Sequence, residues 1–250
     1  MQHDNADSEG AHEQRRLVRF FSAVAADSGA PLPEHATVLD FGCGDGAAVG
    51  AWRDAGHEAH GCDIVLERSQ EWLRLIEVPY RLPFANATFD LVVSNQVLEH
   101  VQDHDAAFSE IRRVLKPGAL SLHLFPPRWT PIEPHVRVPL ATVLQRHWWL
   151  AVWARLGIRN RFQRGMPWRD TAAFNIDYLH ARTNYLPRAQ LLAAGERWFE
   201  QAAFVEALAL KHGRRTRVVY PFVRVLPAFS RLYGGLRARL LLLRRAGIAS

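Results

Sequence analysis

The hydrophobic positions along the chain follow two different periods. Short, nearly continuous apolar runs predict buried strands, and apolar residues recurring every three or four positions predict helices. The predicted strands cover residues 37–41, 58–64, 78–82 (the weakest), 89–94 and 119–125. The predicted helices cover residues 13–28, 47–55, 66–77 (with Leu66, Trp72 or Leu73, and Ile76 inward) and 105–115. Strands that alternate with helices at this spacing indicate a mostly parallel sheet with helices on both faces, an α/β fold.

This alternation stops at residue 126. Residues 126–186 hold five of the eight tryptophans and many prolines, which predicts an insertion over the mouth of the sheet, with a helix at 140–156. The pattern then resumes with a helix at 187–198, which has proline in its first turn. A strand is expected at 202–210, and irregular or helical structure at 214–235.

Composition narrows the class of protein. The chain has 250 residues, 48% of them hydrophobic and 22% charged, which fits one large α/β domain or a domain plus an insertion. Cys43 and Cys62 are the only cysteines, so we expect no disulfide framework and a reducing, cytoplasmic setting. Residues 1–12 are polar and predict a disordered leader rather than a signal peptide. No apolar run approaches the ~18–20 residues that span a bilayer.

Charge is distributed unevenly between the two halves of the chain. Residues 1–130 carry a net charge of −8 and residues 131–250 a net charge of +14, within an overall +6. A basic half suggests an anionic partner such as a phosphate-bearing substrate, a membrane surface or nucleic acid. Because the arginines are scattered rather than massed, a solvated Arg-rich surface explains the pattern equally well.

The first strand leads into a glycine-rich turn at Gly42, Gly44 and Gly46 that opens a helix, an arrangement typical of nucleotide-binding sites. The spacing is G-x-G-x-G rather than the dinucleotide pattern G-x-G-x-x-G. Carboxylates before and inside the turn, Asp40 and Asp45, disfavour a pyrophosphate but suit a ligand with an amine and a sulfonium. A third carboxylate ends the next strand, 17 residues after Gly46, where it can accept both ribose hydroxyls.

The segment V-L-D-F-G-C-G-D-G (38–46) resembles motif I of the class I S-adenosylmethionine (SAM)-dependent methyltransferases. Later segments follow in that family's order: L-P-F (82–84), T-F-D-L-V-V-S (88–94), V-L-E-H-V (97–101) and L-K-P-G (115–118). They look like the subgroup that contains the ubiquinone and menaquinone biosynthesis methyltransferases. The resemblance implies a Rossmann-like, seven-stranded, mostly parallel sheet, SAM as cofactor and S-adenosylhomocysteine as product. It favours a final antiparallel strand for the arginine-flanked apolar run at 238–244, over a basic amphipathic helix on an anionic membrane.

The same resemblance implies roles by position. Asp40 and the backbone of residues 42–44 would hold the amino-acid end of SAM, Asp63 the ribose, and Ile64 would pack on the adenine. Many relatives carry an acidic residue shortly before the L-P-F segment, where this chain has E-V-P-Y-R (77–81), so the adenine contact falls to the backbone near Arg81 and Leu82. The expected cofactor-binding residues are Asp40, Phe41, Gly42, Cys43, Gly44, Gly46, Asp63, Ile64, Leu82, Asn95 and Gln96.

Candidates for the acceptor side lie after the fourth strand and in the insertion. His100 is a candidate general base that could equally support the loop, together with Glu99. Glu133 and His135 stand between prolines, and either a substrate contact or a hydrogen-bonded loop histidine fits this position. Trp129 could wall an acceptor pocket, whereas helical spacing favours a core role for Trp149 and Trp153. No metal ligand set is expected.

The sequence thus predicts four parts: a leader (1–12), a SAM-binding core (13–126), a lid or substrate insertion (127–186), and a completion of the sheet with a basic C-terminal segment (187–250). The predicted function is methyl transfer to an oxygen, or less favourably a nitrogen or carbon, of a small-molecule or lipid- or glycan-linked acceptor, with peripheral contact to an anionic membrane. A SAM-fold protein without catalysis, a NAD-dependent oxidoreductase and an RNA methyltransferase are alternatives. Nucleic acid is not expected as a partner, because no RNA-binding module is present, and the oligomeric state is left open.

Overall fold

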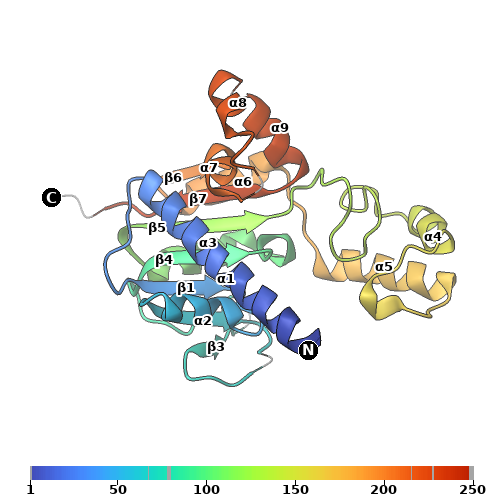
Figure 1. Cartoon of the computed structure of the whole chain (residues 1–250), viewed down its shortest axis with the longest axis horizontal. Helices are drawn as coiled ribbons and strands as arrows, with labels where there is room; N and C mark the ends of the chain where they lie inside the picture. Colours follow the sequence, from blue (N-terminus) through green and yellow to red (C-terminus); the bar gives the residue numbers. More distant parts are fainter. Residues whose placement is uncertain (1, 67, 78–79, 215, 227, 248–250) are drawn as a thin grey trace.

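A computed structural model describes residues 2–66, 68–77, 80–214, 216–226 and 228–247. Its centre is a seven-stranded sheet in the order β3-β2-β1-β4-β5-β7-β6 (Figure 1). The strands are β1 (Thr37–Phe41), β2 (Glu58–Asp63), β3 (Leu73–Leu75), β4 (Phe89–Asn95), β5 (Leu115–Phe125), β6 (Gln201–Phe204) and β7 (Arg239–Arg244). β7 runs antiparallel to both of its neighbours, and the other pairs are parallel. The predicted Rossmann-like, mostly parallel α/β fold is confirmed.

Helices cover both faces of the sheet. One face packs against α1 (Gln2–Asp27), α2 (Ala47–Asp54) and α7 (Glu206–His212), with Phe21 and Trp52 fully enclosed. The other face packs against α3 (His104–Val114) and α6 (Arg188–Trp198), with Phe108 and Leu191 buried. Each helix turns an apolar stripe toward the sheet, which is why the central strands read as continuous hydrophobic runs.

Helix α1 extends further toward the N-terminus than expected. It begins at Gln2, so residues 2–12 are helical rather than a disordered leader. This stretch lacks proline and continues into the helix formers Ala11, Glu13 and Gln14, so a helix nucleated by the buried 17–25 region can extend through it. The helix ends as predicted, near Gly29, which has a φ of 76°.

The described residues of the segment predicted as a helix over 66–77 contain the short strand β3 and no helix. β3 pairs with β2 in parallel, and backbone hydrogen bonds join Gly61 to Trp72 and Ile76 to Asp63. Its few apolar positions fit either period, and pairing with an exposed sheet edge favours the strand. The weak strand predicted at 78–82 starts at residues 78–79, which lie outside the described residues, and Arg81 makes only an isolated bridge to Glu77.

Other element boundaries also differ from the prediction. β5 includes Lys116, Pro117 and Gly118, which were expected to separate helix from strand, and its pairing with β4 shifts register there. The helix predicted at 140–156 is only α4 (His147–Arg155), preceded by turns. The strand predicted at 202–210 is β6 followed by α7.

The arginine-flanked apolar run forms β7, so the strand interpretation is confirmed and the membrane-helix alternative for residues 238–244 is wrong. Leu240 to Leu243 are all buried, because β7 lies between β5 and β6 with helices on both faces. Two short helices precede it, α8 (Tyr220–Val225) and α9 (Ala228–Leu236), and they project from one edge of the molecule (Figure 1). None of the described helices combines the length and hydropathy that crossing a bilayer requires.

The insertion forms a separate lobe beside the sheet (Figure 1). It contains α4, α5 (Trp168–Arg182) and the short 3-10 helix Arg161–Gln163, and it has its own hydrophobic core around Val138, Leu150 and Leu179. Trp149 and Trp153 pack against that core, with ring centroids 5.6 Å apart, as their helical spacing predicts. A one-turn 3-10 helix, Leu98–His100, lies at the junction between the lobe and the sheet.

Candidate functional site

The glycine turn between β1 and α2 has the backbone that its sequence predicts. Gly42, Gly44 and Gly46 all have positive φ angles (79°, 52° and 79°), a region that favours glycine. A Cβ atom on Gly42 would lie 2.4 Å from the Val97 side chain, and one on Gly46 would lie 2.8 Å from Leu73. The turn therefore packs tightly against β3 and the segment after β4, at the carboxyl edge of the sheet.

Asp63 ties this turn to the end of β2. Its Oδ2 accepts a hydrogen bond from the Gly44 N–H at 2.8 Å, and its Oδ1 accepts one from the Ile64 N–H at 2.7 Å. Ile64, directly after it, leaves 55% of its surface exposed and offers an apolar face beside the carboxylate. A ribose and an attached base would find an acceptor and a packing surface side by side here.

Asp40 lies at the bottom of a cavity of about 110 Å³ next to the turn. The cavity lining combines the turn with the ends of β1 and β4, including Gly42, Cys43, Asp45 and Asn95. Burial, together with the nearby carboxylates of Asp63 and Asp45, raises the pKa of Asp40 to about 7. Such a carboxyl is poised to ionise when a cationic group enters the cavity.

The same cavity has a wall that the sequence interpretation missed. Gln14, Leu17, Val18 and Phe21 of α1 line it opposite Asp40. The side-chain Oε1 of Gln14 is buried and has no hydrogen-bond partner among the described residues. A signal was present, because Gln14 is a polar residue on the face that Leu17, Val18 and Phe21 make apolar, at helical spacing.

The other residues predicted to bind the cofactor differ in how far their side chains are accessible. Phe41 is buried in the core, and Cys43 packs against Gly61, where burial raises the pKa of its thiol to about 12 and leaves it unreactive. Gln96 is exposed with a φ of 58°, and its N–H donates to the Leu124 carbonyl. Asn95 is exposed at the end of β4.

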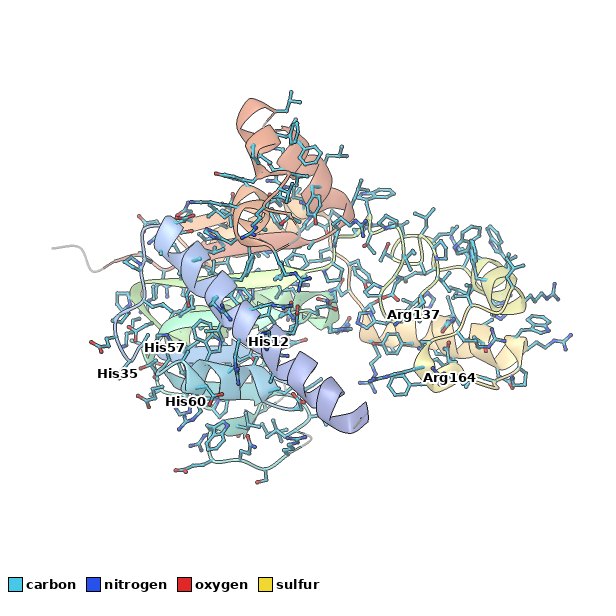
Figure 2. All side chains as sticks on the ribbon, in the orientation of Figure 1. His12, His35, His57, His60, Arg137 and Arg164 are labelled. Atoms are coloured by element: carbon cyan, nitrogen blue, oxygen red, sulfur yellow. The ribbon has the colours of Figure 1, made fainter. Side chains whose placement is uncertain are left out.

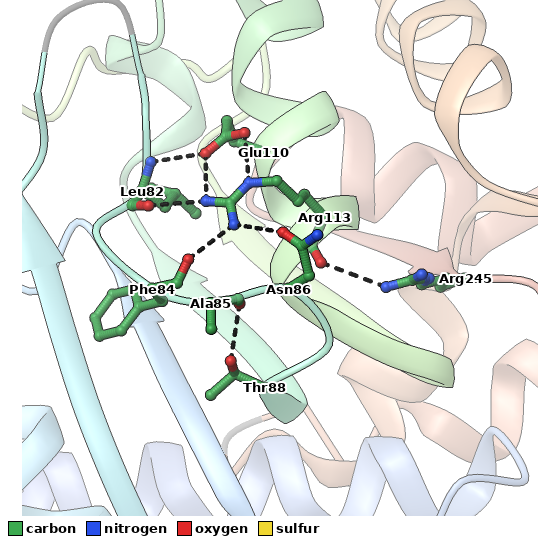
Figure 3. A network of polar contacts seen from close by, with 8 residues as sticks. All are labelled: Leu82, Phe84, Ala85, Asn86, Thr88, Glu110, Arg113 and Arg245. Atoms are coloured by element: carbon green, nitrogen blue, oxygen red, sulfur yellow. Dashed lines mark hydrogen bonds and ion pairs between the residues drawn. The ribbon is translucent and has the colours of Figure 1, made fainter.

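Leu82 lies in a polar network that holds the L-P-F segment. Its N–H donates to Glu110 and its carbonyl accepts from Arg113, both at 2.8 Å, within the polar network of Figure 3. Arg113 also bonds the Phe84 carbonyl, so the L-P-F segment is held by one ion pair. Both backbone groups of Leu82 are therefore engaged within the domain, and its side chain is buried.

A second cluster of polar groups lies where the insertion meets the sheet domain. His100 Nε2 lies 3.1 Å from His135 Nε2, and His135 Nδ1 lies 2.6 Å from Glu133 Oε1. Glu133 is fully buried and also accepts hydrogen bonds from the Tyr185 hydroxyl and from the backbone of Val136. The structure thus brings His100 together with Glu133 and His135, which follow it by 33 and 35 residues in the sequence.

Glu99 completes this cluster. It is 1% exposed, and neither of its carboxylate oxygens has a hydrogen-bond partner among the described residues. Burial raises the pKa of Glu99 to about 7. The insertion is fastened beside it, because the Asn184 N–H donates to the Glu99 carbonyl at 2.6 Å and His100 Nδ1 bonds the Arg182 carbonyl, also at 2.6 Å.

Trp129, the remaining candidate for the acceptor side, lies apart from this cluster. Trp129 is 59% exposed on its loop, with no ring contact to His100 or His135 among the described pairs. His12, His35, His57 and His60 lie over the sheet domain, whereas Arg137 and Arg164 lie in the insertion (Figure 2).

Comparisons with known proteins agree with this fold. A family model described as a methyltransferase domain matches residues 39–122. The malonyl-[acyl-carrier protein] O-methyltransferase of Enterobacter lignolyticus is 31% identical over 116 residues, which cover 44% of this chain and 46% of that protein. The enzyme of the same name from Pseudescherichia vulneris is 37% identical over 93 residues, covering 33% and 36%.

One solved structure supports the fold over most of the chain. The phosphoethanolamine N-methyltransferase 2 of Haemonchus contortus, in complex with phosphomonomethylethanolamine and S-adenosylhomocysteine, superposes with a TM-score of 0.50 at 13% identity. The match covers 91% of this chain and 52% of that one.

The sheet order, the glycine turn and the carboxylates around it, together with these matches, define a class I SAM-dependent methyltransferase domain. The match to the family model of the methyltransferase domain covers residues 39–122 of this chain. The chain spans less than half the length of the curated relatives named above.

Proposed function

We propose that this protein transfers a methyl group from SAM to an oxygen atom of a small or lipid-linked acceptor. The observation that carries the proposal is the cavity at the glycine turn, where Asp40 and Asp63 surround a space suited to a cationic nucleoside. SAM supplies its own leaving group, so the protein mainly has to align acceptor and methyl carbon. The curated relatives are named as O-methyltransferases, which supports oxygen as the acceptor atom.

Titration calorimetry with SAM and with S-adenosylhomocysteine tests this proposal directly. We expect saturable binding of one ligand per chain to the full-length protein. Folded protein that binds neither compound at millimolar concentration would refute the cofactor assignment, and with it the reaction.

On the acceptor side, we propose that His100 and His135 lie beside the acceptor oxygen and promote the loss of its proton. The Arg182 carbonyl can only accept a hydrogen bond, so His100 Nδ1 carries the proton and its Nε2 presents a lone pair. A lone pair there can accept a proton or coordinate a cation, and either use promotes loss of a proton from an acceptor hydroxyl. Glu133 orients His135 in the same way, from the opposite side.

We predict that Gln14→Ala weakens SAM binding about 5- to 30-fold, because the cavity loses one polar contact worth about 1–2 kcal/mol. Calorimetry on the variant measures the change, and Glu13→Ala, one position away on the exposed side of α1, is the matched control. Equal affinities for the Gln14 variant and the wild type would remove α1 from the cofactor site.

We predict that SAM affinity rises as the pH increases through about 7. Asp40 is neutral below its raised pKa and anionic above it, and only the anion attracts the ammonium and sulfonium of the ligand. Calorimetry between pH 6 and 8, a range of about one unit either side of this pKa, measures how SAM affinity changes with pH. The variant Asp40→Asn is the control, because any pH dependence that it retains comes from titration of the ligand itself. A wild-type profile that parallels the Asn variant would contradict the role of Asp40.

The edge formed by α8 and α9 supports a lipid-linked acceptor. Val218, Phe222, Leu226 and Leu232 are all more than 60% exposed, and they lie among the exposed arginines Arg217 and Arg231. Apolar side chains rimmed by cationic ones are typical of surfaces that bind anionic membranes. We propose that this edge brings the protein to its acceptor at a membrane surface.

We predict that vesicles containing phosphatidylglycerol sediment the protein, whereas neutral phosphatidylcholine vesicles do so weakly. The double variant Phe222→Glu/Leu232→Glu should reduce the sedimented fraction several-fold, because it places two carboxylates on the edge formed by α8 and α9. Leu156→Glu and Phe162→Glu, in equally exposed positions of the insertion, form the matched control. If the α8–α9 double variant sediments as the wild type does, this edge is not the surface that binds the membrane.

A further inference from the structure

The two imidazoles at the junction of insertion and sheet domain face each other with their lone pairs. His100 Nδ1 is committed as a donor to the Arg182 carbonyl, and His135 Nδ1 is committed to the Glu133 carboxylate. In their neutral forms both rings therefore present an unprotonated Nε2, and these two atoms lie 3.1 Å apart. Two lone pairs at this distance need a proton or a cation between them.

The surroundings of Glu99 favour a bound cation over a shared proton. A proton shared by the imidazoles would satisfy them but would leave the buried Glu99 carboxylate without a partner among the described residues. One potential ligand atom from each of Glu99, His100 and His135 lies within 4.8 Å of the other two. A cation placed among them would satisfy all three groups at once, which a single proton cannot do.

We propose that Glu99, His100 and His135 form a binding site for a divalent transition-metal cation of the zinc type. Two nitrogens at about 2.1 Å from one metal ion lie about 3.0–3.4 Å apart, so the imidazoles already have the required separation. The Glu99 carboxylate needs to approach by roughly 1–1.5 Å at most, which rotation of its side chain can provide.

The groups behind the ligands fit this assignment. Metal-bound histidines usually donate their other ring N–H to a carboxylate or a backbone carbonyl, and here Glu133 and the Arg182 carbonyl play these parts. Glu133 is itself held by the Tyr185 hydroxyl and two backbone N–H groups, so His135 has a fixed orientation. A histidine pair that only joined the insertion to the sheet domain would not need buried hydrogen-bond partners behind the imidazoles.

The ligand types select the metal. Imidazole nitrogen favours zinc, iron or similar ions over magnesium and calcium, which prefer oxygen ligands. Three protein ligands leave at least one coordination position open, as in catalytic rather than structural sites. An acceptor oxygen could occupy that position; this last step rests on the proposed methyl transfer, whereas the metal site does not.

Zinc binding to the chelator-treated, full-length protein tests the proposal, with a chromophoric chelator as competitor. We expect one equivalent of Zn²⁺ per wild-type chain, bound in the presence of excess Mg²⁺. Glu99→Gln, His100→Ala and His135→Ala should each lower the affinity at least tenfold. Glu133→Gln, which changes only the group behind His135, should lower it about 10- to 100-fold.

His180→Ala is the matched control, because His180 is an exposed histidine of the same lobe, and it should bind zinc as the wild type does. As a second readout, Zn²⁺ should raise the melting temperature of the wild type and leave that of Glu99→Gln unchanged, and visible absorption of bound Co²⁺ should report nitrogen and oxygen ligands. A wild type without a bound equivalent, or ligand variants that bind as tightly as His180→Ala, would overturn the site. Since neither SAM nor an acceptor is present, failure here leaves the proposed methyl transfer standing, and the reverse also holds.

Discussion

Replacing Asp63 by alanine is expected to weaken SAM binding by a factor of a hundred or more. The carboxylate accepts hydrogen bonds from Gly44 and Ile64, and in the proposed complex it would also accept the ribose hydroxyls. Hydrogen bonds to a charged group contribute about 1.5–3 kcal/mol each, so loss of two reduces affinity by roughly two to four orders of magnitude. Calorimetry with S-adenosylhomocysteine measures the change without turnover.

Two variants separate this effect from general damage to the fold. Asp63→Asn keeps an oxygen acceptor but not the charge, and its affinity should fall between those of the wild type and Asp63→Ala. Asp54→Ala removes an exposed carboxylate on α2 and should bind as the wild type does. Binding by Asp63→Ala that matches Asp54→Ala would show that Asp63 only shapes the turn.

The half of the site around Asp63 could be predicted from sequence because its determinants are local. The turn after β1 needs positive φ at three positions, and glycine at 42, 44 and 46 records that need directly. The carboxyl ends of parallel neighbours β1, β2 and β4 meet at one edge, so their order along the chain places Asp40, Asp63 and Asn95 together.

Two of the elements that were predicted wrongly depend on distant partners. The apolar residues at 66, 72, 73 and 76 fit a helix as well as a short strand, and only the free edge of β2 decides between them. The run at 202–210 has the same ambiguity, since β7 pairs with residues as far as Phe204 and the chain then turns into α7. Propensity is a weak guide where tertiary pairing supplies most of the stability.

The acceptor half of the site could be predicted only as separate residues. His100 and His135 were candidates from sequence, with Glu99 named only as a support beside His100, but their approach depends on how the insertion docks through Asn184 and the Arg182 carbonyl. No periodic pattern encodes a contact between a 3-10 turn and a loop 35 residues later. The buried, unpartnered Glu99 carboxylate likewise becomes visible only when its surroundings are known.

Gly42→Ala is expected to lower the free energy of unfolding by about 2–5 kcal/mol. An L residue at a φ of 79° costs about 1–2 kcal/mol, and forcing a methyl group into a packed contact costs about 1–3 kcal/mol more. The second part arises because the new Cβ would lie 2.4 Å from Val97, whose segment follows β4. Urea unfolding of the cofactor-free protein measures the loss.

Gly44→Ala isolates the backbone part of that cost. Gly44 also has a positive φ, but a Cβ there would meet nothing within 4 Å, so its variant should lose only about 1–2 kcal/mol. In a Val97→Ala background the effect of Gly42→Ala should fall toward the Gly44 value, because the collision is removed while the φ cost remains. The alternative result is that Gly42→Ala is equally damaging with and without the Val97 side chain. Position 42 would then not be constrained by close packing of the turn against the segment that leads to Glu99 and His100. The cofactor half and the acceptor half of the site would then lack the rigid connection that this contact provides.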